Sequence, residues 1–181
     1  GSLDSDGEAV RGEEADGLTY VPQPIRGHTN IVRHLVDVGN GVLATAGDDG
    51  VICAWKRETG ERLARMVHGR SDGEVGGERP VTALVRLSPT VLASGSADRS
   101  IALWSTATWQ CIRELKLHEG SVKCLAVFPG TDIFCSGAND NLIGVWSASK
   151  GELLGLVRRS GKSMDENLND LLPLPAYNQI V

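Results

Sequence analysis

A spacing of four residue types recurs three times along the chain and constrains its fold more than any other feature. In each copy an Asp lies four residues after a Ser or Thr and six residues before a Trp, with a His upstream. Self-similarity whose period matches a small sheet is typical of proteins that stack repeated units, so a repeat protein is predicted. The three sets are His28, Thr45, Asp49 and Trp55; His68, Ser94, Asp98 and Trp104; and His118, Ser136, Asp140 and Trp146.

The middle copy carries an insertion. The interval from His to Asp is 21 positions in the first copy, 22 in the third and 30 in the second. The excess lies in residues 69–80, GRSDGEVGGERP, which are rich in turn formers and charge. Loops on a rigid scaffold often carry recognition, so this loop is a candidate protein contact, and a merely tolerated insertion is the alternative. The candidate contact residues are Arg70, Asp72, Glu74, Glu78 and Arg79.

The apolar pattern around these positions predicts an all-β chain. The apolar runs are short, rich in Val, Ile and Cys, and bounded by Gly, Asp, Asn or Ser, which favours antiparallel strands over helices. The expected strands include Ile31–Val38, Val42–Ala46, Val51–Trp55, Arg62–Val67, Val81–Leu87, Val91–Ser94, Ile101–Trp104, Cys111–Leu117, Val122–Phe128 and Leu142–Trp146.

Three segments resemble the core of the WD-repeat β-propeller family: ATAGDDGVICAW (Ala44–Trp55), ASGSADRSIALW (Ala93–Trp104) and CSGANDNLIGVW (Cys135–Trp146). The repeat is degenerate, since only Gly27-His28 keeps the Gly-His pair and no Asp follows any of the three Trp residues. The resemblance implies a partial propeller with three complete four-stranded blades. The expected organisation is an acidic disordered leader at 1–16 and a partial propeller at 17–181, with blades near 28–67, 68–117 and 118–158 and the start of a fourth blade at 168–181.

The His, Ser/Thr and Asp sets have a structural and a catalytic interpretation. The same residue types build a nucleophilic triad, but catalysis needs one such arrangement and this chain repeats it in every copy. In the family it resembles, the Asp and the Ser/Thr hydrogen-bond the His, and the network ends on the Trp indole. Buried polar groups linked in this way satisfy one another and fix how strands meet. We therefore expect structural networks and no enzymatic activity.

Three blades cannot close a ring, because closed propellers typically have about four to eight. Leu18–Ile25 resembles a closing outer strand, and Leu168–Val181 resembles the first strand of a further blade. An open arc would leave unpaired edges and uncovered faces. The expectation is that the remaining blades of a longer chain cover them.

Composition narrows the function classes. Residues 1–19 hold six acids and one Arg, which accounts for the formal charge of −5 of the whole chain. No basic stripe with interleaved aromatics suggests a nucleic-acid surface, and no apolar run is long enough for a membrane span.

The spacing of the cysteines favours reduced core thiols over metal ligands, so no metal or cofactor is expected and a cytoplasmic location is predicted. The cysteines are Cys53, Cys111, Cys124 and Cys135.

Two short motifs near the end of the third copy resemble known functional sites, but neither resemblance is specific. Residues 160–163, SGKS, are similar to the end of a phosphate-binding loop, but Leu156 stands where the first Gly should be. Arg158-Arg159-Ser160 resembles a basophilic kinase site, and a solvated basic turn is the alternative.

Some phrases are particular to one member of the family: IVRHLV ahead of AGDDG, and SVKCL before CSGAND. That resemblance implies a non-catalytic scaffold bound to two DENN-domain proteins, in a complex that acts on small GTPases, regulates autophagy and is recruited to lysosomal membranes. The alternatives are a substrate receptor of a ubiquitin ligase, or a propeller enzyme whose active site lies outside this sequence.

Overall fold

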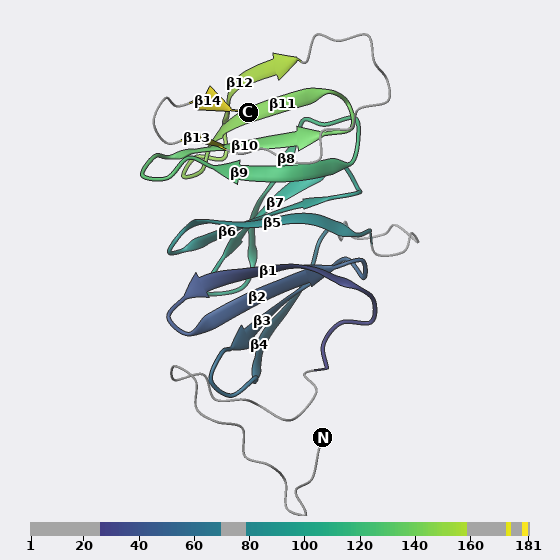
Figure 1. Ribbon diagram of the computed structural model, residues 1–181, viewed down its shortest axis with the longest axis vertical. Helices are drawn as coiled ribbons and strands as arrows, with labels where there is room; N and C mark the ends of the chain where they lie inside the picture. The colour runs from purple at the N-terminus through teal and green to yellow at the C-terminus, as the bar shows by residue number, and fades with distance from the viewer. Residues whose placement is uncertain (1–25, 70–78, 159–172, 175–178, 181) are drawn as a thin grey trace, which may run out of the picture.

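Three four-stranded antiparallel sheets make up most of the described chain. The computed structural model describes residues 26–69, 79–158, 173–174 and 179–180, and within these ranges the regular structure consists of strands, without a helix. Each sheet follows chain order and is called a blade below (Figure 1). Blade 1 contains β1 (Val32–Gly39), β2 (Val42–Gly47), β3 (Val51–Lys56) and β4 (Arg62–Val67); blade 2 contains β5 (Val81–Ser88), β6 (Val91–Ser96), β7 (Ser100–Ser105) and β8 (Cys111–Lys116); blade 3 contains β9 (Val122–Val127), β10 (Ile133–Ala138), β11 (Leu142–Ser147) and β12 (Leu153–Arg158).

The turn that follows each Asp has the same backbone form in all three blades. Between the second and third strands, Gly50, Arg99 and Asn141 take positive φ values of 69°, 79° and 61°. A left-handed residue at this place reverses the chain tightly, so the third strand begins two residues after the Asp. The repeated offset from Asp to Trp follows from this shared turn.

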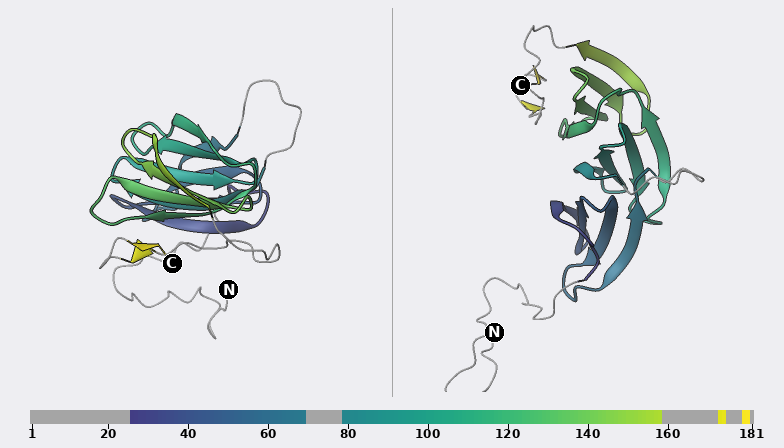
Figure 2. Two further views of the ribbon diagram at one scale, coloured as in Figure 1. Left: turned by 90° about the horizontal axis from the view of Figure 1, so that it is seen from above. Right: turned by 90° about the vertical axis from the view of Figure 1, so that its right-hand side faces the viewer.

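The blades lie side by side along an arc (Figure 2). The face of each sheet that bears the Trp side chain is called the near face, and the opposite face is called the far face. In blades 2 and 3 the near face points toward the blade of lower number. The far face of blade 1 packs on the near face of blade 2 through Ala46, Ile52, Met66, Leu84 and Trp104, all of them buried. The far face of blade 2 packs on the near face of blade 3 through a second core that includes Ile101, Leu115, Leu125, Phe134 and Trp146.

These sheets confirm the predicted all-β, partial propeller fold. A further pair of short strands, β13 (Pro173–Leu174) and β14 (Gln179–Ile180), forms a separate two-stranded sheet. The rest of the expected fourth-blade segment, the acidic leader at 1–16, Leu18–Ile25 and Ser160 lie outside the described residues, as do Arg70, Asp72, Glu74 and Glu78 of the insertion.

Candidate functional site: the repeated polar networks

The network in blade 1 joins four side chains in one line of hydrogen bonds. The His28 Nδ1 lies 3.0 Å from Asp49 Oδ2, and its Nε2 lies 2.8 Å from Thr45 Oγ1. The Trp55 Nε1–H donates to the same hydroxyl at 2.7 Å. The N–H groups of Thr29 and Val51 also donate to the Asp49 carboxylate, so this carboxylate holds together the segment before β1 and the start of β3.

Blade 3 repeats this geometry. His118 Nδ1 lies 3.0 Å from Asp140 Oδ2, His118 Nε2 lies 2.8 Å from Ser136 Oγ, and Trp146 Nε1–H donates to that hydroxyl at 2.9 Å. The N–H of Glu119 donates to Asp140. The structure therefore brings together the predicted residues of the first and third sets in the expected order.

The chemistry of the bonded groups determines which atom donates in each hydrogen bond of these two networks. A carboxylate only accepts, so the His Nδ1–H donates to it, and the Nε2 of the neutral ring is left to accept the hydroxyl proton. The hydroxyl oxygen in turn accepts the indole N–H. Each group uses its hydrogen-bonding capacity on a neighbour, so the network offers no free base beside a free nucleophile.

Blade 2 differs from the expected pattern, because the His ring is reversed and an additional serine enters. His68 Nδ1 lies 2.7 Å from Ser94 Oγ, while its Nε2 lies 3.0 Å from Ser100 Oγ. The Ser100 hydroxyl donates to Asp98 Oδ1 at 2.7 Å, and Asp98 itself stays 3.7 Å from the ring. Trp104 still donates to Ser94 at 2.7 Å. The expectation of a direct His68–Asp98 hydrogen bond is thus wrong, and Ser100 bridges the two.

Sequence reasoning missed Ser100 for an identifiable reason. The positions equivalent to it in the other blades are Val51 and Leu142, so no repeated pattern includes a hydroxyl there. The one available signal was the presence of Ser in place of an apolar residue at the start of a buried strand, where Ser100 is 4% exposed. A buried hydroxyl at such a place requires a partner.

Electrostatics agree with charged carboxylates in blades 1 and 3 and with a neutral ring in blade 2. Burial alone would raise the pKa of Asp49, but hydrogen bonds from His28 and two backbone N–H groups outweigh it and hold the pKa below its usual range. The pKa of Asp140 is lowered in the same way, with burial opposed by hydrogen bonds from two backbone N–H groups and His118. Burial holds the pKa of His68 below its usual value despite the attraction of Asp98.

The remaining polar and thiol groups show no reactive arrangement among the described residues. No cluster of three or more His, Cys, Asp and Glu side chains there could hold a metal ion. Burial raises the pKa of Cys135 to about 11, which disfavours a reactive thiolate. Cys53 and Cys124 are also buried and unbridged, whereas Cys111 is exposed, so the prediction of a core position is wrong for Cys111. Nothing in the described ranges is a helix that could cross a membrane.

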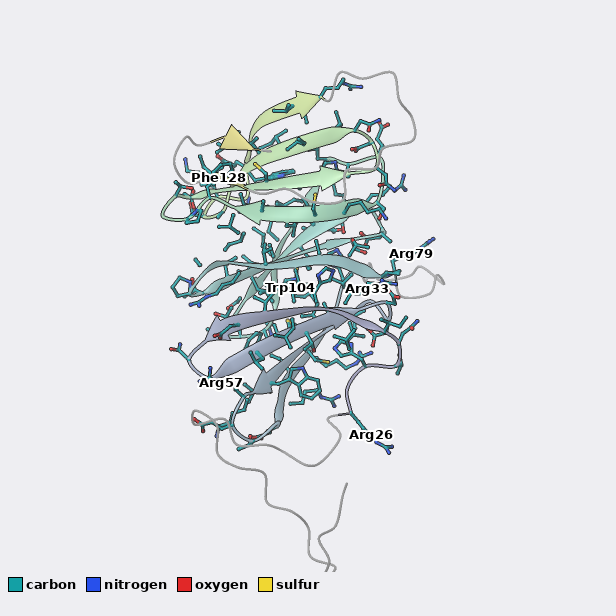
Figure 3. All side chains as sticks on the ribbon, in the orientation of Figure 1. Arg26, Arg33, Arg57, Arg79, Trp104 and Phe128 are labelled. Atoms are coloured by element: carbon teal, nitrogen blue, oxygen red, sulfur yellow. The ribbon has the colours of Figure 1, made fainter. Side chains whose placement is uncertain are left out.

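Charges separate between the two rims of the arc. The rim formed by the residues after each His and by the turns after each Asp is called the His rim, and it carries exposed Arg26, Arg79, Arg99 and Arg158 and half-buried Lys123. None of these five cations forms an ion pair with another described residue. Arg26, Arg33 and Arg79 project on one side of the molecule, and Arg57 lies toward the opposite rim (Figure 3).

Most carboxylates of the His rim are engaged in hydrogen bonds or an ion pair within the chain. Asp49 and Asp140 are bonded to histidines, Asp98 accepts from Ser100, and Asp48 is paired with Arg33, whose Nε and Nη2 lie 2.5 and 2.6 Å from its two oxygens. Exposed Glu119 remains. The opposite rim mixes both signs, with exposed Lys56, Arg57, Lys150, Glu58, Glu61 and Glu152. Among the described residues, the exposed cations of the His rim thus outnumber its exposed carboxylates, although the repeat region has no net charge.

Comparisons with known proteins agree with this architecture. A family model described as the WDR41 β-propeller matches residues 10–180. The chain is similar to WD repeat-containing protein 41 of Mus musculus, with 30% identity over 159 residues, and to that of Homo sapiens, with 27% identity. Each alignment covers 83% of this chain and 32% of the relative, so the chain spans about a third of the length of these relatives. The likeness to one member noted in the sequence is a likeness to this protein.

Solved structures show the same fold at lower identity. The chain is similar to U3-55K, with a TM-score of 0.70, 22% identity and coverage of 82% of this chain and 44% of that one. It is also similar to the WD40 repeats of RRP9, with a TM-score of 0.68, 22% identity and coverage of 82% and 43%. At this identity the likeness shows the propeller fold alone.

Proposed function

Because this chain belongs to the WDR41 β-propeller family, we propose that it is part of a non-catalytic scaffold that binds other proteins through its His rim. The observation that carries the proposal is the closed hydrogen bonding of all three networks. Residue types that could form a triad are bonded to one another at equivalent places in every blade, which is what a structural role requires. A rigid frame with loops of differing length and charge at one rim is suited to recognition.

The charge of the His rim favours an acidic partner surface. Exposed cations that form no ion pair with another described residue attract complementary carboxylates and accelerate encounter with them. Arg99 and Lys123 come from adjacent blades, and Arg79 is the described residue of the candidate contact set at the end of the insertion. Arg79 is exposed beside the start of β5, and this exposure supports the proposal of a contact role for the insertion.

The family suggests a more specific role. We infer that the full-length protein is the propeller subunit of a complex with DENN-domain proteins that regulates small GTPases and autophagy, acting in the cytoplasm and at the lysosomal membrane. The support is the family membership and the similarity to WD repeat-containing protein 41 over 83% of this chain.

Affinity purification of the full-length protein, followed by mass spectrometry, tests both levels of the proposal. The rim variant Arg99→Glu with Lys123→Glu is compared with the control variant Arg57→Glu with Lys150→Glu, which makes the same change in net charge at the opposite rim. We expect the rim variant to lose DENN-domain proteins and the control to retain them. Recovery of ubiquitin-ligase subunits in their place contradicts the specific role, and recovery of no protein from either sample contradicts the scaffold.

A further inference from the structure

The outermost strand of blade 3 exposes a group of leucines. The outermost strands of the three blades, β4, β8 and β12, lie on the convex side of the arc (Figure 2). In β12, Leu153, Leu154 and Leu156 are 44%, 56% and 49% exposed. These three leucines are called the β12 patch below, and an exposed apolar patch of this kind is typical of an interaction site.

The other two blades show that the β12 patch is not needed to build a blade. Leu154 stands at a bulge of the outermost strand, and this bulge holds an apolar residue in every blade, Leu63 in blade 1 and Ile112 in blade 2. The positions one residue before and two residues after the bulge carry arginine, cysteine or glutamate in blades 1 and 2 but leucine in blade 3. They are Arg62, Cys111 and Leu153 before the bulge, and Arg65, Glu114 and Leu156 after it.

The β12 patch lies apart from the face that ends the arc. Leu153 pairs with Trp146, so it lies on the near face, which points toward blade 2. Leu156 pairs with Gly144, two residues from Trp146, so it lies on the near face as well. A Cβ on Gly144 would lie 2.7 Å from Leu117, directly after β8, which shows how closely blade 2 approaches this face. A blade that followed blade 3 would pack against the far face and would leave the patch open.

One end of the patch has a cation without the acid that its counterpart in blade 2 has. The positions equivalent to Leu156 and Arg158 in β8 hold Glu114 and Lys116. The charged groups of Glu114 and Lys116 lie 3.6 Å apart, so blade 2 supplies its own carboxylate. In blade 3 leucine replaces that glutamate, and exposed Arg158 forms no ion pair with another described residue.

A second cation lies at the other end of the patch. Arg113 of β8 reaches the turn before β12, where a Cβ on Gly151 would lie 2.6 Å from Arg113 Cδ. Arg113 is exposed and forms no ion pair with another described residue, including Glu152 beside that turn. Leucines between two such cations favour a ligand that combines apolar side chains with carboxylates.

We propose that the β12 patch binds an amphipathic segment of a partner protein, with apolar side chains on the leucines and carboxylates at Arg113 and Arg158. An apolar centre with a charged rim is the usual composition of a protein interface. A membrane surface fits less well, because anionic lipids are attracted by clusters of about four to eight cations. This surface lies on the convex side of the arc and reaches the His rim only at Arg158, so it can be occupied together with that rim.

Photo-crosslinking in cells that express the full-length protein tests this surface. The photo-reactive residue p-benzoylphenylalanine replaces Leu154 and, in the control, Leu63, which occupies the same bulge in blade 1 and is 42% exposed. Mass spectrometry then identifies the crosslinked peptides. We expect position 154 to capture a segment of another protein that contains apolar residues and carboxylates, and position 63 not to capture it.

A variant of the patch distinguishes specific binding from proximity. Leu153→Arg with Leu156→Glu installs the residues that blades 1 and 2 carry at these positions and leaves the net charge unchanged, so folding is retained, which circular dichroism checks. It should lower the yield of the crosslink from position 154 by about tenfold or more. An unchanged yield overturns the proposal. So does a crosslink from position 154 to this chain, to a second copy of it or to lipid, and so does the absence of any crosslink that the position 63 control lacks.

Discussion

Removing the hydroxyl of Ser94 should destabilise the protein more than any comparable change in blade 1. Ser94 is fully buried, and its hydroxyl accepts the Trp104 indole N–H and donates to His68 Nδ1, each at 2.7 Å. Ser94→Ala leaves both of these buried groups without a partner. An unsatisfied buried group costs about 1–3 kcal/mol, so we expect a loss of about 2–5 kcal/mol in the free energy of unfolding.

The equivalent change in blade 1 provides the comparison. Thr45 makes the same two bonds, but it is half-buried and lines a hollow on the near face of blade 1. Water can replace the lost hydroxyl there, so Thr45→Ala should cost about 1–2 kcal/mol. Ser94→Thr is the matched control: it keeps the hydroxyl and adds one methyl group, for which about 1 kcal/mol of overpacking is expected.

Urea denaturation of the three variants at neutral pH, followed by tryptophan fluorescence and circular dichroism, measures these differences at a low micromolar concentration. Coincidence of the two probes checks for a single transition. The reasoning is refuted if Ser94→Ala costs no more than Thr45→Ala, or if Ser94→Thr is as damaging as Ser94→Ala. Either result would mean that the hydroxyl has no role in satisfying the buried ring and indole.

Three further outcomes are expected. Gly69 has φ +70°, and a Cβ there would meet the Asp98 carboxylate, whereas Gly130 has φ +75° and open space around it. Gly69→Ala should therefore lower the melting temperature more than Gly130→Ala does, and equal decreases would contradict this. The folded-state pKa of His68 lies below its unfolded value of 6.5, so the contribution of the neutral ring to stability is fully present above pH 6.5 and is lost as the pH falls. Urea titrations between pH 8 and 5.5 measure this loss, and unchanged stability would argue against a buried neutral ring. Nitrogen-15 spectra should show His28 and His118 protonated on Nδ1 and His68 on Nε2, and a common tautomer would contradict the reversed ring.

The repeated spacing predicted the fold and the membership of the networks because buried hydrogen bonds between strands need fixed offsets. The strand bounds were predicted less well where turn-forming residues lie inside a sheet. Ser-Gly pairs suggested turns, yet β6 continues through Gly95 to Ser96, and β10 (Ile133–Ala138) contains a Ser-Gly pair as well. Gly95 is needed because a Cβ there would lie 2.5 Å from Val122 of the neighbouring blade. Contact between blades, which no local pattern contains, decided these strand ends.

The orientation of a ring within a network was also beyond local patterns. The spacing of His68, Ser94 and Asp98 is consistent with either orientation of the imidazole, because both ring nitrogens can face a hydroxyl. The uncovered faces at the ends of the arc were expected from the number of blades and not from any local pattern, since Leu35 and Leu84 occupy the same register position and differ only in what packs against them.

The insertion in blade 2 and the additional serine have a common physical explanation. In blades 1 and 3 the residue after the His donates its N–H to the carboxylate, at 2.9 Å from Thr29 and 2.8 Å from Glu119. In blade 2 that residue is Gly69, whose positive φ turns the chain into the insertion, and the carboxylate receives no such bond from it. The Ser100 N–H donates to Asp98 Oδ1 at 2.8 Å, as the N–H groups of Val51 and Leu142 do to their carboxylates, and the Ser100 hydroxyl compensates with an additional bond at 2.7 Å. A longer loop at the His rim is thus accommodated without leaving a carboxylate unsatisfied, which is how one blade can differ at the rim while its sheet stays in register with its neighbours.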